Sequence, residues 1–92
     1  MKFFYKAIFY IWLYFLSLRM ERYLDLDGDS GVVGYEIGDT FIRVKFSGTA
    51  KIYTYSYRKA GVNKVEEMKR LAKCGDGLNS YIKLYANKLY DR

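Results

Sequence analysis

The sequence predicts an α+β fold: a three-stranded antiparallel sheet followed by two helices that pack on one face of it. Two observations predict this fold. Apolar residues alternate over three short segments between residues 32 and 57, and they then recur at helical spacing from Asn63 to Leu89. A third observation, the apolar run Phe3–Leu18, predicts an additional N-terminal helix. We therefore divide the chain into an apolar helix over 1–20 and a β-β-β-α-α domain over 21–92.

The composition is that of a small, basic, aromatic-rich domain. Half of its 92 residues (51%) are apolar, which is enough for a packed core and excludes intrinsic disorder. The chain has no histidine, so it lacks the commonest general base and any histidine-containing zinc site. A single cysteine, Cys74, excludes an internal disulfide. We therefore expect no enzymatic activity, no cofactor and no metal site.

The net charge of +6 favours an anionic partner, such as a nucleic acid or an anionic membrane surface. Half of that charge lies in residues 1–19, on Lys2, Lys6 and Arg19, with no acidic residue beside them. The remaining domain is consequently only mildly basic.

The run Phe3–Leu18 leaves three alternatives open. As a helix its sixteen residues would span about 24 Å at 1.5 Å per residue, which is short of a hydrocarbon core of about 30 Å. It is a short membrane anchor or membrane-lying helix, a helix packed on the domain or in a dimer, or an extension before a start at Met20. We expect a cytoplasmic protein, with membrane association under the first alternative.

The first two strands are predicted at Val32–Ile37 and Thr40–Ser47, joined by a type II′ turn at Gly38-Asp39. Pairing Ile37 with Thr40 gives the hairpin one apolar face and one mostly charged face. The apolar face holds Val33, Tyr35, Ile37, Ile42, Val44 and Phe46. The opposite, outer face holds Glu36, Phe41, Arg43 and Lys45.

The third strand is predicted at Lys51–Tyr57, after a turn at Ser47-Gly48-Thr49. A two-residue loop places Tyr53, Tyr55 and Tyr57 on the core face. A three-residue loop reverses the assignment, because a slip of one residue moves every side chain to the other face.

Two helices follow. The first is predicted over Asn63–Lys73, with Asn63 as its N-cap, Glu66 three residues later and Gly75 ending it. Its apolar stripe is Val65, Met68, Leu71 and Ala72. The second opens at Asp76-Gly77, with Asp76 as its cap. Its apolar stripe is Leu78, Tyr81, Ile82, Tyr85, Ala86 and Leu89.

The chain resembles a known small family, the KTSC domain, over about residues 30–85. The resemblance rests on the run Ser30–Glu36, the strand Phe41–Phe46 and a Tyr-x-Tyr core, either Tyr53-Thr54-Tyr55 or Tyr55-Ser56-Tyr57. It continues in the tail with Gly75, Gly77, Leu78, Asn79 and Ile82. The proline often found before the first helix of such domains is missing, and Ala60-Gly61-Val62 stands there.

The KTSC domain is named for its place at the C-terminus of some lysyl-tRNA synthetases, and it also occurs as a free-standing bacterial protein. The resemblance implies a bacterial or phage-like chain in which Tyr53, Tyr55, Tyr57 and Asn79 are motif residues. Its synthetase context suggests RNA binding and does not imply aminoacylation.

Basic and aromatic residues share the outer face of the predicted sheet. Phe41, Arg43 and Lys45 lie there, and Arg58 and Lys59 follow at the sheet edge. Aromatic rings stack on bases and basic groups neutralise phosphates, a combination found in proteins that bind single strands. The sequence therefore predicts a binding module for RNA or single-stranded nucleic acid.

Two rival interpretations remain. The first is a protein–protein module, binding another protein or forming a homodimer, and membrane-associated if residues 3–18 lie on a bilayer. The second is a calcium loop at Asp25–Glu36, with acids at alternating positions and Glu at position 12. Against calcium, Ser30 replaces the glycine expected at position 6, and a strand pattern follows where a helix should. An ordinary acidic surface loop is the simpler interpretation.

Overall fold

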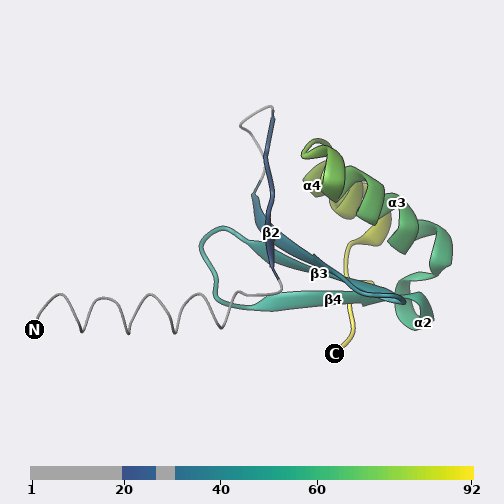
Figure 1. The fold of residues 1–92 in the computed structure, drawn as a ribbon. Helices are drawn as coiled ribbons and strands as arrows, with labels where there is room; N and C mark the ends of the chain where they lie inside the picture. The colour runs from purple at the N-terminus through teal and green to yellow at the C-terminus, as the bar shows by residue number, and fades with distance from the viewer. Residues whose placement is uncertain (1–19, 27–30) are drawn as a thin grey trace, which may run out of the picture.

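The central sheet has four antiparallel strands in the order β1-β2-β3-β4 (Figure 1). The computed structural model describes residues 20–26 and 31–92, so the predicted helix over 1–20 lies almost wholly outside the described residues. The strands are β1 (Glu21–Arg22), β2 (Val32–Ile37), β3 (Phe41–Phe46) and β4 (Ile52–Ser56). The α+β class is confirmed, and the prediction of three strands is wrong.

The missed strand, β1, is only two residues long, too short for apolar alternation to reveal it. Glu21 pairs with Tyr35 and Arg22 pairs with Gly34. Tyr23 follows, and it is buried in the core although it lies before the segment from which we predicted the sheet.

The β2–β3 hairpin pairs two positions away from the predicted register. Ile37 pairs with Ile42, and the Gly38 N–H donates to the Phe41 carbonyl at 2.9 Å, so the turn residues are Asp39 and Thr40. Gly38 has no positive φ, so the predicted type II′ turn is wrong. Its lack of a side chain makes room for the ring of Phe41, whose Cε1 would lie 2.1 Å from an added Cβ.

A shift of two positions keeps each side chain on its predicted face, with one exception. Ile42 and Val44 are fully buried, as predicted. A β-bulge between Val32 and Gly34 inserts one extra residue, so Val32 is buried and Val33 is exposed. The prediction that Val33 faces the core is therefore wrong.

The pairing of β3 with β4 determines which face of the sheet the tyrosines occupy. Ile42 pairs with Tyr55 and Val44 pairs with Tyr53, which is the parity of the two-residue loop. Tyr55 is buried and Tyr53 packs against the core. Tyr57 is no longer in the strand, because it begins a short helix, α2 (Tyr57–Ala60), that the sequence did not predict.

The helices α3 and α4 lie on one face of the sheet (Figure 1). Helix α3 (Val62–Cys74) buries Val65, Met68 and Ala72 and ends at Gly75, as predicted. Its N-cap is Gly61 rather than Asn63, with no side-chain cap, so the predicted capping box is wrong.

The last helical segment differs from the single predicted helix. It consists of α4 (Leu78–Tyr81), continued by a π-helical turn, η1 (Ile82–Ala86). Leu78, Ile82 and Ala86 are buried, whereas Tyr85 is exposed. The N-cap is Gly77, not Asp76, and the Leu78 N–H instead donates to the hydroxyl oxygen of Tyr23 at 3.2 Å. A distant side chain thus replaces the local cap.

Candidate functional site

Phe41, Arg43 and Lys45, which were predicted for the outer face, lie on β3, and Arg43 forms an ion pair with Glu36 of β2. Its Nη1 lies 3.1 Å from Glu36 Oε1, and its guanidinium lies 4.7 Å from the centroid of the Phe41 ring. This ion pair neutralises Arg43. The structure therefore brings Phe41 and Arg43 together with an acid, and it leaves Lys45 as the cation of this group that has no ion pair among the described residues.

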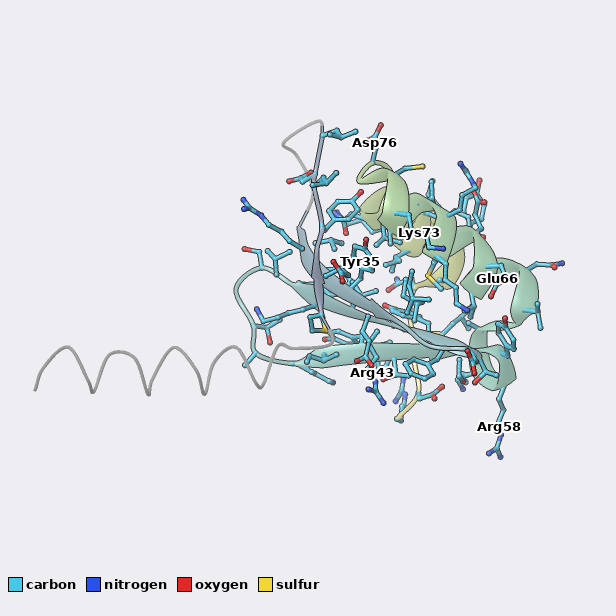
Figure 2. The ribbon with its side chains drawn as sticks, viewed as in Figure 1. Tyr35, Arg43, Arg58, Glu66, Lys73 and Asp76 are labelled. Atoms are coloured by element: carbon cyan, nitrogen blue, oxygen red, sulfur yellow. The ribbon has the colours of Figure 1, made fainter. Side chains whose placement is uncertain are left out.

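Arg58 and Lys59 lie on a different element, α2, and both are exposed. Arg58 extends away from the body of the protein (Figure 2). Together with Asp91 and Arg92 they line a surface pocket of about 490 Å³. The five predicted nucleic-acid residues therefore form two groups rather than one surface.

A second pocket, of about 380 Å³, lies between the core face of the sheet and the last helical segment. We call it the tyrosine pocket. Its lining is Phe46, Thr49, Tyr53, Tyr55, Asn79, Ile82, Lys83, Asn87, Lys88 and Tyr90. Three of the four motif residues line it, namely Tyr53, Tyr55 and Asn79. This pocket was not predicted from the sequence. The two features that pointed to it were the core-facing tyrosines of the third predicted strand and the second predicted helix.

Three aromatic pairs build the wall of the tyrosine pocket. The ring centroids of Tyr53 and Tyr90 lie 4.8 Å apart at an interplanar angle of 78°. Phe46 meets Tyr53 at 5.5 Å, and Tyr55 meets Tyr90 at 6.4 Å, both edge to face. Such pairs stabilise each other, so the rings are held in place without a ligand.

Several polar side chains that line the tyrosine pocket have no hydrogen-bond partner among the described residues, and Tyr55 and Asn79 are two of them. Tyr55 is only 2% exposed, yet its hydroxyl makes no hydrogen bond to a described residue, and neither does the Asn79 amide. Among described residues no fully buried side-chain N or O atom lacks a partner, so solvent reaches both groups. Burial, followed by the neighbouring Tyr53 and Tyr90, raises the pKa of Tyr55 to about 12. It is therefore a neutral donor at ordinary pH.

The charges around the tyrosine pocket are positive. Lys83 and Lys88 line it, and no carboxylate of a described residue does. The Nζ of Lys51 lies 4.8 Å from the Tyr53 ring centroid and 5.4 Å from that of Tyr90. None of these three lysines forms an ion pair with a described residue. The pocket therefore combines aromatic, amide and cationic groups.

The fourth motif residue, Tyr57, has a structural role instead. Its hydroxyl donates to Glu66, whose carboxylate also pairs with the buried Lys69 at 2.9 Å. Lys69 in turn donates to the Asp39 carbonyl at 3.2 Å. This network joins α2 and α3 to the β2–β3 turn, and the hydrogen bond to Glu66 raises the pKa of Tyr57.

The calcium loop is not assembled within the described residues. Glu36 belongs to β2 and pairs with Arg43, and Asp27 and Asp29 lie outside the described part of the chain. Residues 20–26 and 31–92 contain no group of three or more side chains suited to hold a metal ion. In the same ranges, no helix has the length and apolar character needed to cross a bilayer.

No protein-family description, curated protein or solved structure matches the chain. The resemblance to the KTSC domain therefore stays a prediction that rests on the residues quoted for it.

Proposed function

We propose that this chain is a non-enzymatic, KTSC-like binding module for RNA or single-stranded nucleic acid. The observation that carries the proposal is the tyrosine pocket. In it, among the described residues, aromatic rings converge with side-chain amides that have no hydrogen-bond partner and lysines that have no ion pair, and no carboxylate lies there. Its volume of about 380 Å³ falls within the range of small-molecule sites, roughly 300–1,000 Å³.

The tyrosine pocket offers suitable groups for both the base and the phosphate of a nucleotide. Stacking on an aromatic ring is worth about 1–3 kcal/mol per base in single-strand binding, and it tolerates different bases. Lys51, Lys83 and Lys88 supply the positive charge that phosphates need. The synthetase context of the KTSC domain supports the same partner.

The residues predicted from the sequence have secondary roles under this proposal. Lys45, Arg58 and Lys59 are unpaired among the described residues and add phosphate contacts. Arg43 contributes less, because its charge is paired with Glu36.

A salt titration of binding to a labelled, unstructured RNA tests the proposal. Replacing Lys83 and Lys88 together with alanine should lower the slope of log affinity against log salt concentration by about 1.4, since each phosphate contact on a single strand contributes about 0.7. The matched control replaces Lys64 and Lys73, two lysines of α3 outside the pocket, and should leave the slope almost unchanged. Absence of binding at low salt would refute the function.

A second candidate function is protein binding or self-association. Leu84 and Tyr85 stand side by side on η1 and are 73% and 57% exposed. Sedimentation velocity at increasing protein concentration separates the two: a dimer without RNA affinity would favour the second function.

A further inference from the structure

The surface pocket formed by Arg58, Lys59, Asp91 and Arg92 is positively charged, and we call it the basic pocket. None of its three cations forms an ion pair with a described residue, Asp91 included. The Asp91 carboxylate instead accepts from the Ser56 hydroxyl at 2.7 Å. Three cations against one carboxylate suit an anion, and no aromatic ring of a described residue lines this pocket to hold a base.

The C-terminal residues join the basic pocket to the tyrosine pocket. Tyr90 lines the tyrosine pocket, whereas the next two residues, Asp91 and Arg92, line the basic pocket. Because consecutive Cα atoms are about 3.8 Å apart, the Cα atoms of Tyr90 and Arg92 lie no more than about 7.6 Å apart. The two pockets therefore adjoin, at a spacing comparable with that of neighbouring phosphates in an extended single strand.

The order of the two pockets is the same along β4 as along the C-terminal residues. The ring of Tyr90 lies 4.8 Å from that of Tyr53, and the Asp91 N–H donates to the Thr54 carbonyl at 2.7 Å. The C-terminal residues and β4 therefore run in the same direction. Helix α2, which supplies the other two cations of the basic pocket, begins directly after β4. Both chains thus lead from the tyrosine pocket to the basic pocket.

The two sides of the basic pocket are held together without a ligand. The Ser56 hydroxyl accepts from the Lys59 N–H at 3.2 Å and donates to the Asp91 carboxylate. The Tyr57 hydroxyl donates to Glu66, which fixes α2 to α3. None of these contacts uses a cationic group of the pocket, so the positive charge stays available to a ligand. A site arranged in advance binds more tightly, because less order has to be created on binding.

We infer that the basic pocket is a phosphate subsite for the strand whose neighbouring nucleotide occupies the tyrosine pocket. The inference rests on the proposed function and deepens it, since it makes a continuous strand the preferred partner rather than a mononucleotide. Arginine and lysine contacts to phosphate carry no information about the base. The selectivity that we infer is therefore for strand length, not for sequence.

NMR titrations of the full chain with uridine monophosphate and with a uridine hexanucleotide test this inference. The affinity of each ligand is measured at the backbone amide resonance of Tyr53, which reports on the tyrosine pocket. Replacing Arg58 and Lys59 together with alanine should weaken the hexanucleotide about fivefold, as expected for two exposed charge contacts. The same variant should leave the affinity of the monophosphate at Tyr53 unchanged.

The salt dependence gives a second measure of the same change. For the hexanucleotide, the slope of log affinity against log salt concentration should fall by about 1.4 in this variant, because two phosphate contacts are lost. The matched control, alanine at Lys64 and Lys73 of α3, removes equal charge outside both pockets. It should keep both the affinity and the slope.

A further measurement needs no variant. In the wild-type protein the backbone amide resonances of Arg58 and Lys59 should shift over the same range of hexanucleotide concentration as that of Tyr53.

The outcomes separate the two proposals. If the alanine variant binds the hexanucleotide as tightly as the wild type, or if the amides of Arg58 and Lys59 do not move, the phosphate subsite is wrong and RNA binding at the tyrosine pocket stands. If the hexanucleotide shifts no resonance at low salt, the proposed function itself fails.

Discussion

Tyr55 combines a ring deep in the core with a hydroxyl that opens onto the tyrosine pocket. Its ring packs with the buried residues of the sheet, so the side chain serves both the fold and the candidate site. The sequence offered two loop lengths with opposite faces for this ring, and the register Ile42–Tyr55 selects the core face. The same reasoning could not reveal the exposed hydroxyl, because that depends on where α4 and Tyr90 lie.

The ionisation of Tyr55 should make the folded protein less stable in alkali. Below pH 10 the hydroxyl is protonated in both states, but from pH 10 to about 12 the unfolded chain loses this proton while the folded one keeps it. The free energy of unfolding should therefore fall over that interval. Urea unfolding at several pH values measures the decline.

The control for this prediction is Tyr55→Phe, which keeps the ring and has no proton to lose. Tyr35, Tyr57 and Tyr81 also have raised pKa values, so both proteins will lose stability in alkali. The wild-type decline should be the steeper one. Equal slopes would mean that Tyr55 ionises with its ordinary pKa.

At the level of helices and strands, long periodic segments were predictable and local irregularities were not. Strand β2 was predicted with its observed bounds, and β3 within one residue. The bulge at Val33 and the π turn of η1 interrupt regular structure at places that no apolar period marks. The missed cap is not marked by a local pattern either, because Tyr23 lies 55 residues before the Leu78 N–H that it accepts.

The end of α3 offers a test at this scale. Gly75 has φ +75°, and an added Cβ would come within 2.6 Å of the Leu24 Cβ. Gly75→Ala should therefore combine the strain of a left-handed residue, about 1–2 kcal/mol, with a steric clash. We expect a loss of unfolding free energy of about 2–4 kcal/mol, measured by urea denaturation.

Gly48 provides the matched control. It has a similar φ of +82°, and nothing lies within 4 Å of an added Cβ. Gly48→Ala should cost only the backbone strain. A loss as large as that of Gly75→Ala would show that the contact with Leu24 is not what distinguishes the two sites.

At the scale of the whole molecule, the last three residues join the sheet to the candidate site. Tyr90 lines the tyrosine pocket, the Asp91 N–H donates to the Thr54 carbonyl at 2.7 Å, and the Arg92 guanidinium lies 5.6 Å from the Tyr90 ring centroid. Figure 1 shows this segment passing the sheet after the helices. The sequence could not reveal the connection, because residues 90–92 have no periodic pattern.

Removing residues 90–92 should therefore affect both stability and binding. The truncated protein loses two aromatic contacts of Tyr90, worth about 0.5–1.5 kcal/mol each, and should unfold at a lower temperature. Its affinity for RNA should also fall. The control adds a Gly-Ser tail after Arg92, which keeps every contact, and unchanged stability in the truncated protein would contradict this role.

The two outermost strands have a consequence for how copies of this protein meet at high concentration. An unpaired strand is a template on which another chain can extend the sheet, as happens in fibril growth. On one side β1 is only two residues long and carries Glu21 and Arg22, both exposed. On the other side Asp91 occupies the Thr54 carbonyl of β4, and its carboxylate accepts from the Ser56 hydroxyl. The short, charged strand β1 protects one edge of the sheet, and Asp91 of the C-terminal segment occupies part of the other edge at β4. Both features oppose strand-by-strand polymerisation of the folded domain.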